Sequence, residues 1–244
     1  MKKVLLISIL SLFLYANETD FTDSFEEEFA VSNQEVFDPL SGYNRVMTSF
    51  NDGFYTYVLS PVSKSYAFAV PEVARTGIDN FFTNLMFPVR FVNNLLQFKF
   101  ENASKELGRF VVNTIWGLGG FMDQATNTLG MEIYHEDFGQ TLGYWGVGEG
   151  FHVVLPILGP SNLRDIVGLG AGLALAPTSQ LGHNTIPYKI PQNDLQELGI
   201  DTLYKTNEYS FHPDLYNSIK KDALDLYPYL RDIYTQKRNK EIAE

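Results

Sequence analysis

The sequence predicts a single all-α domain that follows a signal peptide and an acidic tail. Three observations favour it: apolar residues recur at helical spacing from Asp38 onward, alternation with a period of two is scarce, and no internal repeat is present. The chain has 244 residues, of which 45% are hydrophobic, enough for one substantial core but not for two large domains. We expect residues 1–16 to be the signal peptide, 17–37 the tail and 38–240 the helical domain.

The N-terminal sequence MKKVLLISILSLFLYA is typical of a secretory signal peptide. Two lysines precede an apolar run from Val4 to Leu14, and Ala16 is the small residue expected before a cleavage site. The run would rise only about 17 Å as a helix, whereas the hydrocarbon core of a bilayer is about 30 Å thick. An uncleaved anchor is the alternative, because Leu14 is not the small residue preferred three positions before the cut.

The charge pattern argues against nucleic acid as a partner. Residues 17–38 contain eight acidic residues and no basic one, which is typical of a solvated tether. The chain as a whole has a formal net charge of −11, and residues 39–244 carry −5 of it. No basic stripe of the kind that binds phosphate backbones is present. The sequence also contains no cysteine, which excludes disulfides, zinc thiolates and thiol nucleophiles.

Apolar stripes, caps and prolines predict the helices in the first half of the domain. One helix begins near Pro71, and Pro88 interrupts it before a second stripe starts. Asn102 is expected to cap a third. The three stripes are Ile78, Phe81, Phe82 and Leu85; then Val89, Val92 and Leu96; then Ala103, Leu107, Phe110, Val111 and Thr114.

The second half is richer in glycine and proline. The polar stretch 123–137 is expected to be a loop or hairpin, and VVLP at 153–156 is the best strand candidate. Ser161 is expected to cap a helix through residue 176, whose glycines permit close backbone approach. Two C-terminal helices are expected at about 194–206 and 214–240, the second bent near Pro228.

No recognised catalytic or nucleotide-binding motif is present. The chain lacks G-x-S-x-G, H-E-x-x-H, G-x-x-x-x-G-K-[ST] and G-x-G-x-x-G, and Gly146-Val-Gly148-Glu-Gly150 has the wrong spacing. His135-Glu136-Asp137 is the one local group of metal-ligand types, and a polar turn is favoured there because tight sites need more ligands. We therefore expect neither enzyme activity nor a cofactor.

Arginines and asparagines recur inside the apolar, amphipathic segments. Two explanations stay open: surface placement or internal pairing, and an amphipathic passage in which guanidinium and amide groups receive lipid head groups. The 19 Phe and 14 Tyr suit an interfacial exterior and a plain core nearly equally. The candidates for head-group contact or polar lining are Asn44, Arg45, Asn51, Arg90, Asn93, Asn94, Arg109, Asn113 and Arg164.

Five glycines between Phe138 and Phe151 form the second candidate site. Either they make tight turns between helices, or they form a hinge or rim of a lipid passage, where Tyr144, Trp145 and Phe151 reach an interface. These glycines are Gly139, Gly143, Gly146, Gly148 and Gly150.

Several of these segments, in this order, resemble the motifs of the MlaA/VacJ outer-membrane proteins. They are DPLSGYNRVMTSFND (38–52), VPEVARTGIDNFFTNLMFPVRFVNNLLQ (70–97), ELGRFVVNTIWGLGGFMD (106–123), EDFGQTLGYWGVGEGFHVVLPILGPSNLRDIVG (136–168) and DLYPYLRDIYTQKR (225–238). The resemblance covers most of 38–238 and is weakest from 169 to 224.

The resemblance implies an all-helical, ring-shaped protein in the periplasmic leaflet of the Gram-negative outer membrane. Such proteins remove misplaced phospholipids from the outer leaflet through a central amphipathic channel, often beside trimeric porins. They pass the lipid to a soluble periplasmic carrier, and an ATP-driven inner-membrane transporter completes the route. A porin-binding scaffold and a lipid hydrolase are the alternative functions.

One departure from the family pattern concerns the anchor. Many members carry a lipidated cysteine after a Leu-x-Ala sequence, whereas here Leu14-Tyr15-Ala16 is followed by Asn17. We therefore expect this chain to be exported, not lipidated, and held by an apolar belt and in some settings by a porin.

Overall fold

The structure is a computed structural model that describes residues 37–181, 186–221 and 223–244. The predicted signal peptide and the acidic tail up to residue 36 lie outside these residues. Residues Pro39–Glu244 pack as one unit. Helices account for nearly all of its regular structure, with one pair of short strands, which confirms the all-α class.

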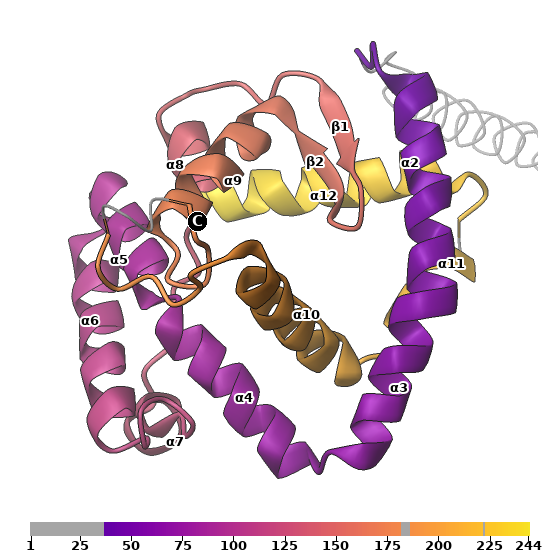
Figure 1. The fold of residues 1–244 in the computed structure, drawn as a ribbon. Coiled ribbons are helices and arrows are strands. Elements are labelled where there is room, and N and C mark those ends of the chain that lie inside the picture. The colour runs from indigo at the N-terminus through magenta and orange to yellow at the C-terminus, as the bar shows by residue number, and fades with distance from the viewer. Residues whose placement is uncertain (1–36, 182–185, 222) are drawn as a thin grey trace, which may run out of the picture. The chain divides into compact units, whose positions relative to one another are not determined.

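The unit begins with a long, unbroken helical segment. It consists of α2 (Ser41–Phe54), the π-helical turn η1 (Tyr55–Leu59) and α3 (Ser60–Ala69). The predicted start near Pro71 is confirmed, because α4 (Glu72–Leu85) follows that proline directly. Proline suits this place because its fixed φ is compatible with helix entry and its missing N–H is not needed there. Figure 1 shows α10 (Asp194–Ser210) lying between α3 and α4, and it contacts both.

Helices α5 (Phe87–Leu96) and α6 (Phe100–Ile115) pack against each other. Pro88 lies in the first turn of α5, as the sequence predicts. The predicted cap of α6 is wrong, since the helix begins two residues before Asn102. The reason is local: Phe98 adopts a left-handed backbone with φ of 59°, which ends one helix and lets the next start at once.

The stretch 123–137 is not purely a loop. It contains the short helix α7 (Gln124–Leu129), which the Asp123 side chain caps by accepting from the Thr126 N–H. Helix α8 (Phe138–Tyr144) then starts with a capping box in which Asp137 and Gln140 bond each other's backbone. The polar residues that predict a loop are here mainly caps.

An antiparallel hairpin of β1 (His152–Leu155) and β2 (Gly159–Asn162) follows, with His152 opposite Asn162. The predicted strand is confirmed in β1, whereas its partner GPSN has turn-like composition and escapes prediction. Helix α9 (Leu163–Leu175) is capped by Asn162 and not by Ser161, which belongs to β2. Helices α8 and α9 pack closely, and a Cβ built at Gly168 would lie 2.3 Å from the Gly139 nitrogen.

The C-terminal helices differ from prediction in two respects. Helix α10 runs four residues beyond the expected end, but the single helix expected at 214–240 is two helices, α11 (Leu215–Lys221) and α12 (Leu226–Ala243). Asp225 caps α12, so Pro228 falls in a first turn and causes no bend. Helix α12 packs against α8, α2 and β2.

Buried positions of the unit are mostly polar, and many large hydrophobic side chains are exposed. Among the described residues, eight hydrophobic side chains are buried, against 27 polar or charged ones. Helix α6 shows the pattern clearly, since its buried positions include Glu106, Arg109 and Asn113. Its exposed positions include Phe100, Leu107, Val111 and Ile115, which share one helical face. Soluble proteins have the opposite arrangement, with charged residues almost never fully buried.

Candidate functional site

Two asparagines of α2 hold the edge of β1. The Asn44 amide donates to the His152 carbonyl at 3.0 Å, and its Oδ1 accepts from the Val154 N–H at 2.8 Å. Two helical turns further along α2, the Asn51 amide donates to the Leu155 carbonyl at 2.9 Å. The two amides are seven residues apart on one face of α2 and satisfy backbone groups that a third strand would otherwise pair. Both are buried.

Arg45 is the exception among the predicted arginines, because its side chain is 53% exposed. It donates to Asp225 at 2.7 Å and lies over the Tyr227 ring at 5.6 Å from its centroid. Its guanidinium therefore keeps donors available to an anionic group at the α2–α12 edge.

A buried ion pair joins α5 to α6. The Arg90 Nε donates to Glu106 Oε2 at 2.7 Å, and Glu106 Oε1 accepts from the Tyr134 N–H at 2.8 Å. One turn along α5, Asn93 Oδ1 accepts from the Thr141 hydroxyl at 2.7 Å and so reaches α8. The Asn94 amide donates to the Tyr134 carbonyl, while its buried Oδ1 has no hydrogen-bond partner among the described residues.

A second buried pair closes the segment after α6. Arg109 Nη2 contacts both carboxylate oxygens of Asp123 at 3.0 Å, and Asn113 donates to the same carboxylate at 2.9 Å. Arg109 also donates to the Thr126 hydroxyl and the Met131 carbonyl. Burial favours the neutral acid at Asp123, but the hydrogen bonds from Thr126, Asn113 and Arg109 outweigh it and lower the pKa.

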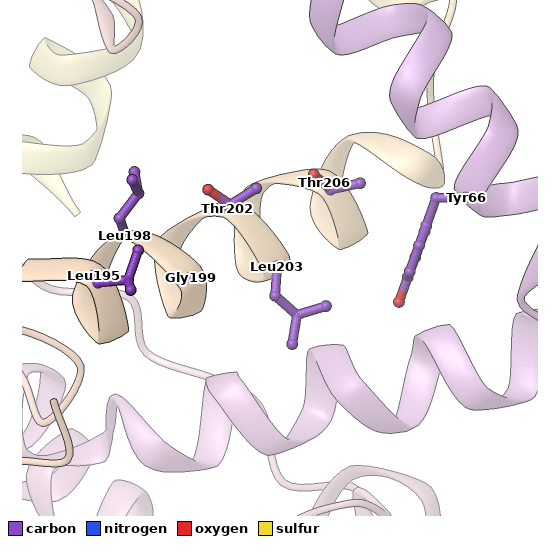
Figure 2. Close-up of a pocket in the computed structure, with 7 residues that line it drawn as sticks. All are labelled: Tyr66, Leu195, Leu198, Gly199, Thr202, Leu203 and Thr206. Atoms are coloured by element: carbon purple, nitrogen blue, oxygen red, sulfur yellow. The ribbon is translucent and has the colours of Figure 1, made fainter.

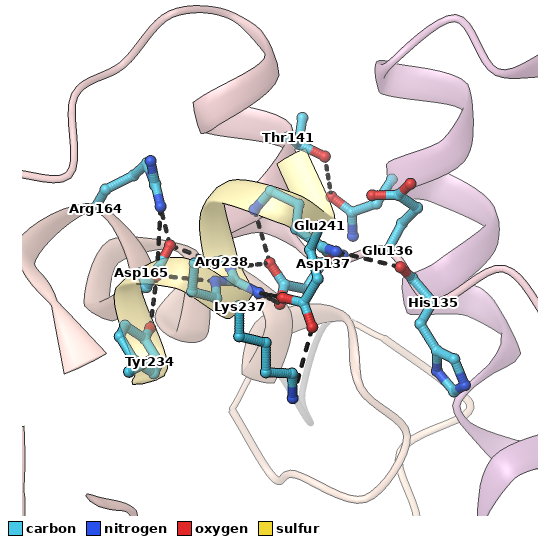
Figure 3. Close-up of polar contacts among 12 residues, drawn as sticks. His135, Glu136, Asp137, Thr141, Arg164, Asp165, Tyr234, Lys237, Arg238 and Glu241 are labelled. Carbon is cyan, nitrogen blue, oxygen red and sulfur yellow. Dashed lines mark hydrogen bonds and ion pairs between the residues drawn. The ribbon is translucent and has the colours of Figure 1, made fainter. Parts of the chain in front are cut away.

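The largest polar cluster joins α8, α9 and α12 (Figure 3). The Asp165 carboxylate accepts from Arg164 at 3.0 Å, from Arg238 at 3.0 Å and from the Tyr234 hydroxyl at 2.6 Å. Arg238 also forks onto both oxygens of Asp137 at 2.9 Å. Burial alone would raise the pKa of Asp165, but these hydrogen bonds lower it below its usual value.

The structure thus pairs all nine predicted polar residues with protein groups; eight of them are buried, whereas Arg45 is half-exposed. Internal pairing, one of the two explanations the sequence leaves open, describes those eight. Contact of any of the nine with lipid head groups stays a prediction. The residues that sequence reasoning missed are the acids that complete the networks, Glu106, Asp123 and Asp137, together with Arg238. Glu106 carried the same signal, a charged residue on an amphipathic helix. Asp123 and Asp137 precede helices as caps, and Arg238 lies on the mostly polar helix α12, so that signal does not mark them.

The five predicted glycines divide into three kinds. Gly139 and Gly143 lie where helices touch: a Cβ at Gly139 would lie 2.3 Å from Asp165 Oδ1, and one at Gly143 would lie 2.6 Å from Ile242 Cδ1. Gly146 and Gly150 have φ of 81° and 71°, which side chains rarely adopt. Gly148 has neither constraint, since no atom lies within 4 Å of its built Cβ.

An open apolar cavity of about 460 Å³ lies along the surface of α10 and reaches Tyr66 of α3. Figure 2 shows Leu195, Leu198 and Leu203 projecting from successive turns of α10, with Tyr66 of α3 at one end. Leu195 and Leu198 are strongly exposed, at 78% and 63%. Its size and lining suit an aliphatic chain. The remaining lining residues are Gly199, Thr202 and Thr206.

The metal alternative at residues 135–137 gains no support. Glu136 accepts from Lys99 and Gln97. Asp137 faces Arg238 (Figure 3), so the two carboxylates are engaged with different partners. In the part of the chain that the structure describes, no group of three histidine or acidic side chains is placed to hold a metal ion. Nor does any described helix combine the length and apolar character needed to cross a bilayer.

Comparison with known proteins adds four relationships. Residues 36–241 match the MlaA lipoprotein family. A Rickettsia bellii protein is 28% identical over 98% of this chain and 91% of its own length. The intermembrane phospholipid transport system lipoprotein MlaA of Shigella flexneri is 34% identical, covering 83% of this chain and 77% of its own. A solved structure that describes the structural basis for maintenance of bacterial outer membrane lipid asymmetry matches with a TM-score of 0.70 and 30% identity. That match covers 85% of this chain and all of the other.

Proposed function

Because the chain belongs to the MlaA lipoprotein family, we propose that it transports phospholipid and so helps to maintain outer-membrane lipid asymmetry. In the finer form of this proposal, it removes mislocalised phospholipid from the outer leaflet through a central channel within a ring of helices. It then passes the lipid to a soluble periplasmic carrier. A trimeric porin is a further partner in this proposal.

The observation that carries the proposal is the inverted distribution of side chains. Charged and amide groups fill the spaces between helices, while large hydrophobic side chains face outward on α6 and α9. Apolar surface exposed to water is unfavourable, and its transfer into hydrocarbon lowers the free energy by about 25 cal/mol per Å². The described helices do not span a membrane, so the proposed location is within one leaflet.

The α10 cavity is the proposed contact for the acyl chain. Three leucines dominate its lining, and Tyr66 supplies a ring and a hydroxyl at one end. The cavity offers neither a histidine nor a carboxylate, which general acid–base hydrolysis would require. We therefore place the protein among transporters and not enzymes. The direction of flow then comes from the carrier and its transporter, because a passage without an energy source lets a gradient relax.

Deletion of the gene tests this function in the cell. Phospholipid in the outer leaflet is expected to accumulate, measured by labelling its amine head groups from outside, and the full-length gene should restore the normal level. A scaffold that only binds porins would leave outer-leaflet phospholipid unchanged on deletion. A hydrolase would instead release free fatty acid when the purified chain meets phospholipid.

The anchoring proposal follows from the absence of cysteine in the sequence. We propose that the apolar exterior holds the chain in the outer membrane after the signal peptide is removed. Carbonate at high pH strips proteins held by charge and leaves those held by hydrocarbon contact, so the chain should stay in the membrane pellet. Complete release into the supernatant would refute the apolar anchor.

Gly148 offers the cleanest test of a flexible rim. Gly148→Val should slow phospholipid transport without unfolding the domain, because its Cβ meets open space and its backbone is not left-handed. Gly146→Val is a poorer test, since a φ of 81° would strain valine whatever the function. Normal transport by a folded Gly148→Val protein would reduce the stretch to a set of turns.

A further inference from the structure

The loop that follows α6, residues 116–122, combines left-handed backbone with exposed apolar side chains. Leu118 has φ of 56°, and Gly119 and Gly120 follow with φ of 75° and 102°. Leucine is disfavoured in this region, where glycine is strain-free. Yet the Leu118 side chain is 67% exposed, so the protein itself gives it little contact in return.

The loop is apolar throughout. Residues 110–122 contain no charged residue, and Trp116 and Met122 are 65% and 48% exposed. The exposed face of α6, from Phe100 through Val111 to Ile115, leads directly into it. One uncharged surface therefore extends from the C-terminal end of α6, residues 110–115, into the loop.

The loop is also braced at its base and bonded internally. Arg109 and Asn113 both bond Asp123, which joins its two ends. The Gly119 N–H donates to the Thr114 carbonyl and the Met122 N–H to the Gly117 carbonyl. The Phe121 carbonyl accepts from the Asn80 amide of α4. Backbone that enters a poorly hydrated region needs such partners, because unpaired N–H and C=O groups are costly there.

We propose that the 116–122 loop is a membrane wedge, which seats Trp116, Leu118 and Met122 at the boundary between lipid head groups and acyl chains. This proposal rests on the proposed membrane location and adds the part of the chain that enters the bilayer. An uncharged surface of aromatic and aliphatic side chains is complementary to lipid hydrocarbon. Indole rings favour the interface between membrane and water.

The two tryptophans of the chain make the wedge measurable. In a Trp145→Phe protein, Trp116 is the sole indole reporter, and the matched Trp116→Phe protein keeps Trp145. Each full-length protein is diluted from mild detergent into phosphatidylcholine vesicles that carry bromine at known acyl positions. Flotation measures vesicle association, and quenching measures depth. We expect Trp116 to be quenched, more by bromines near the head group than by those near the chain ends.

Three other outcomes would overturn the wedge. If the protein floats with the vesicles while Trp116 is not quenched, the wedge fails and the membrane location stands. If neither protein floats, both fail. If the fluorescence emission of Trp116 shifts to shorter wavelength only when purified porin trimer is added, the loop binds a protein and not lipid.

Substitution of Leu118 is an independent test, because thermal stability and vesicle binding are expected to change in opposite directions. Asparagine tolerates left-handed backbone, so Leu118→Asn should raise Tm by about 2–4 °C. It should also weaken vesicle binding about tenfold, because a leucine side chain leaves hydrocarbon. Leu118→Met, which keeps the apolar side chain, should preserve binding without raising Tm. A rise in Tm with unchanged vesicle binding, or a parallel loss of both, would contradict the wedge.

Discussion

The Arg238→Met protein is expected to lose about 3–5 kcal/mol of unfolding free energy, the usual effect of removing one partner from a buried ion pair. Arg238 is the link between Asp165 at the start of α9, Asp137 at the start of α8, and its own helix α12. Its removal leaves the Asp165 carboxylate buried with one cationic partner, Arg164, and removes the ion pair between α12 and Asp137 at the start of α8.

Urea unfolding in mild nonionic detergent, followed by helical circular dichroism, measures this loss. The control is Lys237→Met, one residue earlier on α12, because Lys237 is 71% exposed and lies 3.5 Å from Glu241. An exposed pair of this kind contributes about 0–1 kcal/mol. Equal effects of the two substitutions would show that the cluster does not hold the helices together.

The same cluster predicts how stability depends on pH. The folded pKa of Asp165 lies below its usual value of 3.8 because the hydrogen bonds from Arg238, Arg164 and Tyr234 outweigh the effect of burial. A carboxyl group whose pKa is lower in the folded than in the unfolded protein stabilises the fold. This stabilisation is complete at pH values above the unfolded-state pKa and is lost as the pH falls through the folded-state pKa. The acid limb of the stability profile should therefore become shallower in Arg238→Met.

The Leu198→Asp protein is expected to fold normally and to transport phospholipid at least about tenfold more slowly. A charged side chain in a hydrocarbon environment costs roughly 2.5–3.5 kcal/mol, and partial hydration of the cavity reduces that figure. Leu198 projects from α10 into the apolar cavity and is 63% exposed, so its replacement removes little packing. The outer-leaflet labelling assay in cells measures the effect.

Leu198→Met is the matched control, since it keeps an apolar side chain of similar volume in the same place. It should transport like the wild type. Gly199→Ala, with no atom within 4 Å of its built Cβ, tests whether any substitution on this face is harmful. Unimpaired transport by a folded Leu198→Asp protein would exclude the α10 cavity from the lipid path.

The helices were predictable where local chemistry determines them. Pro71 and Pro88 mark helix starts, and the apolar residues of α4, α5 and α6 recur every three or four positions in the sequence. The break between α11 and α12 was not predictable. The helical pattern of the sequence continues through Asp225, the residue that caps α12. The second strand was hidden for the opposite reason, since GPSN becomes a strand only by pairing with β1.

The polar residues show where sequence reasoning stops. Asn44, Arg90 and Arg109 stand out on apolar helices, which identifies them as unusual. Whether such a residue lines a passage or binds a partner inside the protein depends on what faces it. Those partners, such as Glu106 opposite Arg90 and Asp123 opposite Arg109, come from other elements. The α10 cavity has the same origin, because Tyr66 and Leu198 are brought together by packing of α3 and α10 alone.

Transfer of phospholipid from the purified full chain to a soluble acceptor tests the central claim most directly. The chain is isolated in mild detergent, its bound lipid is identified by mass spectrometry, and a periplasmic lipid carrier is then added. We predict that intact phospholipid copurifies with the chain and moves to the carrier, and that Leu198→Asp retains less of it. Protein that is folded but carries no phospholipid and delivers none, or that releases fatty acid in its place, would contradict the account.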